Sequence, residues 1–183
     1  MTERNEPTVD VATVTRHTVT AEVVIRPARS ADLPLLEWSG EFWHYREKFR
    51  TAYADQLAGR RLLLVADLNG YPVGRVAIVF SGGNPLYANG HSRAYLYSLQ
   101  VMPFLQGLGI GTRLLDSAED VLRARGFRHA IIAAALDNQG AQRLYRKRGY
   151  VRYAEDPGRW SYTDPDGVVH QVEEPCWLMR KRL

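Results

Sequence analysis

Apolar and polar positions first follow a regular pattern at Val23, after 21 residues without a clear period. We therefore expect residues 1–21 to form a flexible N-terminal tail and residues 22–183 to form a single domain. The domain opens with a short strand at Val23. A helix is then expected to begin at Ser30 and to continue to about Trp38.

Residues 41–60 carry aromatic and apolar side chains at helical spacing, which predicts a second helix. A β-hairpin should follow, because residues 61–67 and 72–80 are rich in strand-forming side chains and flank the dipeptide Asn69-Gly70. This dipeptide is typical of a type I′ turn, in which both central residues need a positive φ.

The centre of the chain alternates between strand and helix patterns. A strand is expected from Tyr95 to Met102, with one face formed by Tyr95, Tyr97, Leu99 and Val101 and the other by Leu96, Ser98 and Gln100. A helix then runs from Ile110 to Gly126, residues 130–136 form a buried strand, and residues 137–150 form another helix. The C-terminal residues 159–183 are expected to form three further strands. This succession of elements predicts an α/β protein.

Composition supports one compact domain and excludes several other classes. The chain has 183 residues, of which 45% are hydrophobic and 24% charged, and a net charge of +4. It has neither a bilayer-length apolar run nor a signal-like N-terminus, so we expect a cytoplasmic protein. The five histidines show no metal-ligand spacing, which predicts no metal site. The single cysteine, Cys176, is expected to be a buried structural thiol.

The segment QGLGIGTRLL, residues 106–115, places glycines just before the helix that begins at Ile110. A helix N-terminus offers unpaired N–H groups, and glycine lets an anion approach the main chain closely. A P-loop is disfavoured because the segment lacks its lysine. A dinucleotide-binding loop is disfavoured because Thr112 stands where a third glycine belongs.

Two motifs together resemble the GCN5-related N-acetyltransferase (GNAT) family. Gln106, Gly109 and Gly111 match its Q/R-x-x-G-x-G/A loop, and the later motif matches at Asn138, Ala141, Tyr145 and Gly149. The resemblance runs from about Val23 to the C-terminus. It implies a mixed central sheet of about six to seven strands, splayed between the fourth and fifth and flanked by about four helices.

The resemblance also implies that acetyl-CoA is the co-substrate. The residues expected to bind it are Leu99, Gln100, Val101, Gln106, Gly107, Leu108, Gly109, Ile110, Gly111, Thr112, Asn138, Ala141 and Tyr145. Many family members have arginine where this chain has Gln106. Nine Lys and Arg against four Asp and Glu between residues 106 and 152 place the basic excess where a polyphosphate would bind.

In this family the amine attacks the thioester directly, so no covalent enzyme intermediate is expected. By resemblance Tyr145 is the general acid that protonates the leaving thiolate, and an N–H near Val101 polarises the thioester carbonyl. The general base stays open, because the fourth strand has no carboxylate. Four residues that could act through water are Glu37, Glu41, Glu173 and His170.

The acceptor is expected to be the primary amine of a small molecule, held by aromatic side chains that could equally belong to the core. These aromatic side chains are Trp38, Phe42, Trp43, Tyr45, Tyr95 and Tyr97. A protein N-terminus or lysine as acceptor, and a non-catalytic acyl-CoA sensor, remain alternatives. No nucleic-acid or membrane partner is expected, and the long C-terminal part could shape the acceptor cleft or a homodimer contact.

Overall fold

The computed structural model describes residues 20–82 and 84–183, so the predicted tail lies almost wholly outside the described residues. A seven-stranded sheet has the order β1-β2-β3-β4-β5-β9-β6, and β7 and β8 form a separate two-stranded hairpin. The strands are β1 Val23–Pro27, β2 Arg61–Leu68, β3 Tyr71–Val79, β4 Arg93–Val101, β5 His129–Ala135, β6 Val151–Asp156, β7 Arg159–Thr163, β8 Val169–Glu173 and β9 Cys176–Arg182. The α-helices are α1 Arg46–Leu57, α2 Ile110–Ala124 and α3 Gln139–Lys147, and short 3-10 helices span Ser30–Asp32, Leu35–Glu37, Trp43–Tyr45 and Pro103–Leu105.

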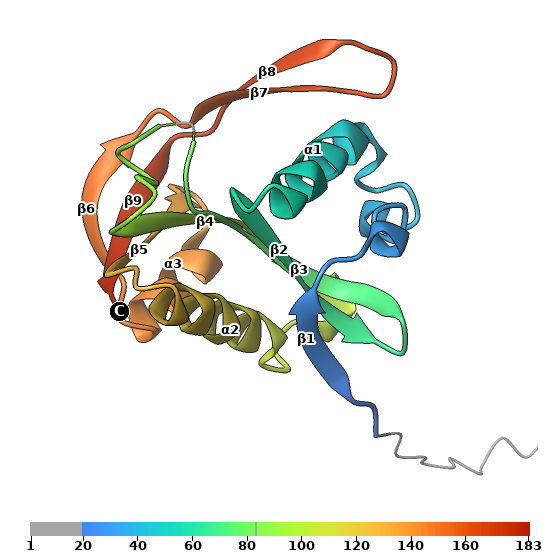
Figure 1. Cartoon of the computed structure of the whole chain (residues 1–183), viewed down its shortest axis with the longest axis horizontal. Coiled ribbons are helices and arrows are strands. Elements are labelled where there is room, and N and C mark those ends of the chain that lie inside the picture. The colour runs from blue at the N-terminus through green and yellow to red at the C-terminus, as the bar shows by residue number, and fades with distance from the viewer. Residues whose placement is uncertain (1–19, 83) are drawn as a thin grey trace, which may run out of the picture.

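The elements form layers on both faces of the sheet (Figure 1). Helices α2 and α3 cover one face, α1 covers the other, and the β7–β8 hairpin arches over α1. Only β4 and β5 pair in parallel; the other pairs of this sheet are antiparallel. The predicted mixed sheet of six to seven strands is confirmed. In the described part of the chain, none of the helices has the length and apolar character that a bilayer crossing requires.

Apolar side chains on one face of α2 form the centre of the main core. Ile110, Leu114, Leu115, Ala118 and Leu122 are all buried against the sheet. Burying such side chains is the main favourable contribution to folding, at about 25 cal/mol per Å² of apolar surface. Because α2 is anchored in this core, it holds in place the glycine segment, which connects the end of β4 to α2.

The N-terminal helix predictions were partly wrong. Instead of a helix from Ser30 to Trp38, the structure has two short 3-10 helices, and α1 begins only at Arg46. Trp38 and Ser39 adopt left-handed backbone conformations, which end the helical path. Tertiary contacts hold this bend: the indole N–H of Trp38 donates to the carbonyl of Pro72 at 2.8 Å, and the buried Arg75 donates to the carbonyl of Leu36 at 2.9 Å.

Strand β4 contains a bulge that the simple alternation did not predict. Gln100 pairs with Arg75 and Tyr97 pairs with Ala77, so β4 has one more residue than β3 across this step. Ser98 has a φ of 53°, consistent with a bulge at this position. The prediction of a single face from Tyr95 to Val101 was therefore wrong after Tyr97. Leu99 and Val101 instead pack with Leu96 against α2, and Gln100 lies on the side of Arg75.

The hairpin between β2 and β3 matches its prediction. Asn69 and Gly70 have φ values of 52° and 86°, as a type I′ turn requires.

Candidate active site

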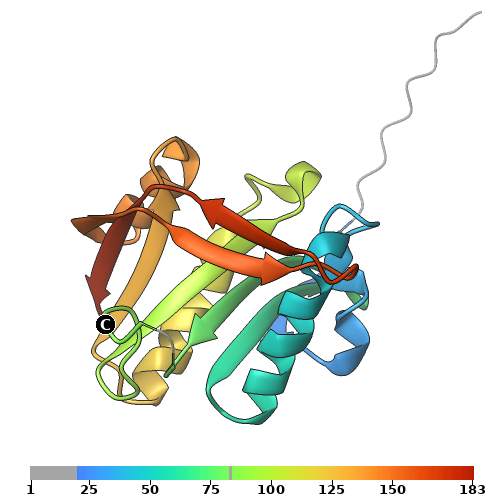
Figure 2. The same ribbon diagram turned by 90° about the horizontal axis from the view of Figure 1, so that it is seen from above.

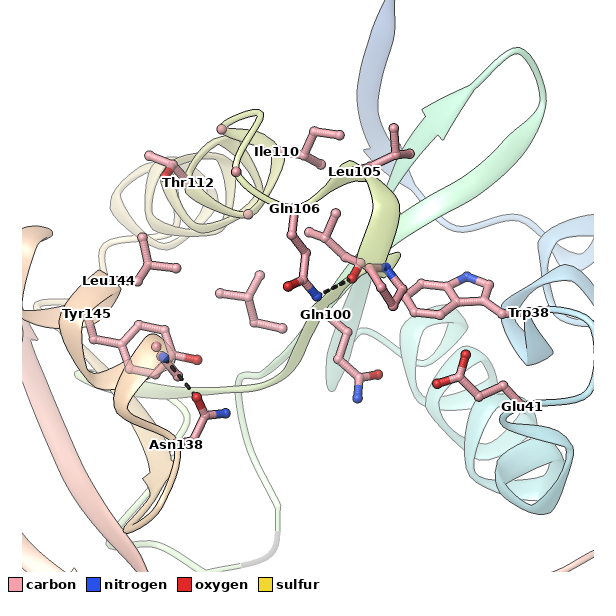
Figure 3. A pocket seen from close by; sticks show the side chains of 18 of the residues that line it. Trp38, Glu41, Gln100, Leu105, Gln106, Ile110, Thr112, Asn138, Leu144 and Tyr145 are labelled. Carbon is pink, nitrogen blue, oxygen red and sulfur yellow. Dashed lines mark hydrogen bonds between the residues drawn. The ribbon is translucent and has the colours of Figure 1, made fainter.

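Strands β4 and β5 separate after a short paired segment. Their parallel pairing runs from Arg93 with His129 to Leu96 with Ile132 and then stops. Past this point a cavity of about 620 Å³ lies between the end of β4, the start of α2 and the start of α3. In Figure 3, Tyr145 and Asn138 lie on one side of this cavity, and Trp38 and Glu41 lie on the opposite side.

The cavity brings together all but one of the residues expected to bind the cofactor. It is lined by Leu99, Gln100, Val101, Gln106, Gly107, Gly109, Ile110, Gly111, Thr112, Asn138, Ala141 and Tyr145. The exception, Leu108, is not among the lining residues, and its side chain is 70% exposed. Trp38 and Phe42, which were expected at the acceptor, line it as well, and sequence reasoning missed Pro103, Leu105, Gly140 and Leu144.

The glycine segment leaves main-chain donors open to this cavity. Gly107 and Gly109 have φ values of 81° and 84°, and a Cβ added at either would meet no heavy atom within 4 Å. The helical hydrogen bonds of α2 begin with the amide of Arg113, which donates to the carbonyl of Gly109 at 3.0 Å. The amides of the preceding turn have no helical acceptor, so this end of α2 suits a phosphate.

Gln106 has a structural contact that explains how it can replace arginine. Its side-chain amide donates to the carbonyl oxygen of Val101 at 3.0 Å (Figure 3). This hydrogen bond ties the glycine segment to the end of β4. The residue thus orders the loop and contributes no charge to it.

Part of the basic excess expected near the cofactor is already paired. Arg123 contacts Glu119 at 2.9 Å and Asp120 at 2.7 Å, and Arg148 pairs with Asp116. These ion pairs lie along α2 and at the end of α3, and their arginines are partly exposed. The excess of positive charge available to a phosphate is therefore smaller than the sequence count suggests.

Asn138 and Tyr145 form the α3 side of the cavity. The Asn138 side chain accepts a hydrogen bond from the amide of Ala141 at 2.9 Å and so caps α3. Tyr145 is 5% exposed, and burial raises its pKa well above the usual tyrosine value. Its hydroxyl therefore stays protonated throughout the physiological pH range.

A second cavity, of about 540 Å³, lies on the α1 face of the sheet under the β7–β8 hairpin. It shares with the first cavity the residues Leu99, Gln100, Asn138, Ala141 and Tyr145. The gap between β4 and β5 thus joins a loop suited to phosphate on one face with a covered cavity on the other.

The family model for the acetyltransferase (GNAT) family matches residues 31–150 of the chain. The chain belongs to the GNAT family. The family is the one that the two motifs predicted.

Two curated relatives match parts of this GNAT chain. N-alpha-acetyltransferase 30 of Schizosaccharomyces pombe is 31% identical over 61 residues, which are 33% of this chain and 41% of the relative. Mycothiol acetyltransferase of Cellulomonas flavigena is 32% identical over 124 residues, which are 63% of this chain and 36% of the relative. The chain thus spans less than half the length of these relatives.

Solved structures support the same fold. Naa50 of Arabidopsis thaliana, in complex with a bisubstrate analogue of CoA, has a TM-score of 0.63 at 20% identity and matches 88% of this chain and 99% of its own. A GNAT acetyltransferase of Elizabethkingia anophelis with acetyl-CoA bound has a TM-score of 0.57 at 17% identity and matches 88% of this chain and 98% of its own. These likenesses show that the chain has the fold of these acetyltransferases.

Three of the four proposed bases do not lie at the junction of the two cavities. Glu37 accepts two hydrogen bonds from Arg46, at 2.6 and 2.8 Å, which lower the pKa of its carboxyl group. Glu173 pairs with Arg159 at 3.1 Å on the surface of the hairpin. His170 bonds Asp164 at 2.7 Å, also within the hairpin. Because each carboxylate or imidazole already has a partner away from Tyr145, these three are poorly placed as bases.

The fourth proposed base, Glu41, lines the cofactor cavity. The second cavity is lined by a carboxylate that sequence reasoning missed, Asp156. Asp156, at the end of β6, accepts hydrogen bonds from the Tyr87 hydroxyl and, at 2.7 Å, from the amide of Gly158. No local pattern marks it, because its place depends on the pairing of β6 with β9 and on the start of the hairpin.

Cys176 is buried, as predicted, at 7% exposure. It nevertheless lines the second cavity together with Tyr145, although it is far from every motif in the sequence. Burial raises the pKa of its thiol, which therefore stays neutral at pH 7 and is a weak nucleophile.

The hairpin that covers the second cavity is held to α1 by aromatic contacts. The ring of Tyr45 lies 4.8 Å from that of Tyr162 and 6.0 Å from that of Trp160, centroid to centroid. Figure 2 shows β7 and β8 crossing above the sheet from the β6–β9 edge to the α1 side. Of the aromatic residues proposed for the acceptor, Tyr95 and Tyr97 line this cavity, Trp38 is buried and Trp43 is 40% exposed.

Proposed function

We propose that this GNAT enzyme transfers the acetyl group of acetyl-CoA to the primary amine of a small molecule by direct attack. The observation that carries the proposal is the junction at Tyr145, where the cofactor cavity meets a second cavity covered by a hairpin. The cover leaves room for a compact acceptor. An extended protein segment would need an open groove along this face.

The residues of the first cavity fit acetyl-CoA. The open N–H groups of the Gly107–Thr112 segment suit its phosphates, and the edge of β4 after Leu96 has no strand partner on the β5 side. The main chain of Leu99 to Val101 can therefore bond an extended arm of the ligand as an added strand would. An N–H near Val101 would stabilise negative charge on the carbonyl oxygen of the thioester.

Two side chains that line the second cavity can carry out the two proton transfers of the reaction. The Tyr145 hydroxyl keeps its proton, because its pKa is raised, and can donate it to the departing sulfur as negative charge develops there. Of the two carboxylates that line the second cavity, Glu174 and Asp156, we assign to Asp156 the attraction of the acceptor ammonium and the uptake of its proton, directly or through Tyr87. The neutral Cys176 thiol favours direct attack over an acyl-enzyme.

The experiment is a thiol-release assay with acetyl-CoA and a panel of small amines and peptides. In Tyr145→Phe, turnover should fall about 100-fold, because only the hydroxyl is lost, while acetyl-CoA affinity should change little. Tyr150→Phe is the matched control, since its ring lies 6.0 Å from that of Tyr145 but lines neither cavity. Equal turnover of both variants, measured where chemistry limits the rate, would rule out the general acid. Acetylation of peptides alone would rule out the small-molecule acceptor.

A further inference from the structure

Positive charge gathers on the α1 side of the covered cavity. Lys48 of α1 and Arg61 of β2 line it, and Arg75 of β3 lies beside them, 1% exposed, in the wall shared by α1 and the sheet. Buried cations are costly unless an anion or hydrogen bonds compensate them. The partners of each cation therefore indicate what the cavity is built to hold.

Lys48 has aromatic neighbours in place of a counter-ion. Its ammonium nitrogen lies 3.8 Å from the ring centroid of Trp160 and 4.8 Å from that of Tyr45. Within residues 20–82 and 84–183, it makes no salt bridge at 4.0 Å or less. Burial, with Arg75 and Arg61 adding to it, lowers the pKa of Lys48 to about 8, and the exposed Glu174 opposes this only in part. An anion in the cavity would compensate this ammonium group.

Arg75 makes no salt bridge within the described residues, and the Glu41 carboxylate offsets its buried charge only in part. Its guanidinium lies between the rings of Trp38 and Phe42, each 4.5 Å away, and donates to the Leu36 carbonyl and to the Gln100 side chain. Both acceptors are neutral. The charge of Arg75 therefore acts across the cavity wall, where the low dielectric increases its effect.

Arg61 is compensated only in part. It donates to the Tyr97 hydroxyl and contacts Asp55 at 3.2 Å, but Asp55 also binds Arg60 at 2.5 Å. Two guanidinium groups thus share one carboxylate, and this edge of the cavity keeps an excess positive charge.

The second cavity is also lined by two carboxylates, Glu174, which acts on Lys48, and Asp156, which lies on the side of Tyr145 and Cys176. Asp156, Cys176 and Tyr145 line it together with Tyr95, whose ring lies 5.1 Å from that of Tyr87, the residue whose hydroxyl donates to Asp156. A cavity with a carboxylate on the side of Tyr145 and cations on the side of α1 fits a molecule that carries charges of both signs.

We propose that the acceptor carries, on the same molecule as its amine, an anionic group that binds to Lys48 and Arg61. A carboxylate or a phosphate would provide this chemistry. The inference rests on the proposed function, because it assigns the acceptor of that same site. In the bound state the ammonium end lies toward Asp156 and Tyr145, and the anion lies toward α1.

The test uses pairs of amines that differ only in the anion. Suitable pairs are phenylalanine with phenethylamine, 4-aminobutyrate with propylamine, and phosphoethanolamine with ethanolamine. At pH 7 the anionic member of at least one pair should have a kcat/KM at least about tenfold above its neutral partner. Which pairs show the preference distinguishes carboxylate from phosphate.

Lys48→Met should reduce this ratio to within about threefold of unity, by loss of the charge-assisted contact. Arg50→Met is the matched control, because Arg50 is on the same helix, pairs with Glu47 and is 61% exposed; it should keep the wild-type ratio. A wild-type preference for the neutral amines, or a preference for the anionic members that persists in Lys48→Met, would overturn the inference.

A second measurement separates the inference from the proposed function. Calorimetric titration with hydrocinnamate and with inorganic phosphate, in the presence of CoA, should show binding to the wild type that weakens about tenfold or more in Lys48→Met. Binding of these anions without acetylation of any amine would refute the proposed function alone. Acetylation of amines without anion binding would refute the inference alone.

Discussion

Replacing Lys48 with methionine should stabilise the folded protein at neutral pH. Burial lowers the pKa of Lys48 from 10.5 to about 8, and each pKa unit corresponds to about 1.4 kcal/mol. Holding the charged form in the fold therefore costs about 3 kcal/mol. The contacts with Trp160 and Tyr45 return about 1 to 2 kcal/mol of cation–π energy, so the expected net gain is about 1 to 2 kcal/mol.

The stability difference between the wild type and Lys48→Met should depend on pH. The folded-state pKa of Lys48 lies below its unfolded value, so between about pH 8 and pH 10.5 the unfolded chain binds more protons than the folded one. The stability of the wild type relative to Lys48→Met therefore rises across this window. Below pH 8 the charged form is present in both states, and the full cost applies.

Urea denaturation of both proteins at pH 7 and pH 10 measures the effect. Lys48→Met should be more stable by about 1 to 2 kcal/mol at pH 7, which for a chain of this size is a rise of about 2 to 8 °C in Tm, and the advantage should shrink by a similar amount at pH 10. A variant that is less stable than the wild type at pH 7, or a difference that does not change with pH, would refute the reasoning. Arg50→Met, which removes an exposed charge on the same helix, should show neither effect.

Three further predictions concern the binding of CoA and two of the glycines. CoA should raise the Tm of the wild type more than NAD or ATP does, because a ligand that binds only the folded state stabilises it, and Gly109→Val should lower acetyl-CoA affinity about tenfold or more in calorimetry. An equal affinity in a folded Gly109→Val protein would contradict the assigned phosphate site. In Gly158→Ala, the new Cβ would lie 1.8 Å from the carbonyl oxygen of Glu174, so the base of the hairpin must shift. We expect a loss of about 2 kcal/mol or more in stability and a higher KM for the acceptor with the KM for acetyl-CoA unchanged, whereas a fall in both affinities would show that the hairpin does not act separately.

The parts of the site that were predictable depend on local sequence. The apolar stripe of α2, the glycines before it and the cap of α3 at Asn138 each involve residues within a few positions of one another. Hydrophobic periodicity and helix-capping patterns involve residues this close in the chain, so the sequence shows them directly. This explains why twelve of the thirteen residues expected at the cofactor lie around one cavity.

The parts that were missed depend on partners far along the chain. The bulge at Ser98 exists only in the pairing of β4 with β3, and the left-handed bend at Trp38 is held by the carbonyl of Pro72. Asp156 reaches the second cavity because β6 pairs with β9 and because Tyr87, 69 residues away, donates to it. No local pattern contains these contacts, so the acceptor side could not be assigned from the sequence.

The β7–β8 hairpin offers a route to enzyme redesign. All strand pairing of residues 159–173 is internal to the hairpin, which leaves the main sheet after Asp156 and rejoins it at Cys176. The glycine segment and α3 belong to other parts of the chain, so a graft of a longer, shorter or differently charged hairpin would change the acceptor side and leave the cofactor loop intact. If the second cavity holds the acceptor, as proposed, a library confined to residues 159–173 should change the choice of amine and leave the binding of acetyl-CoA unchanged.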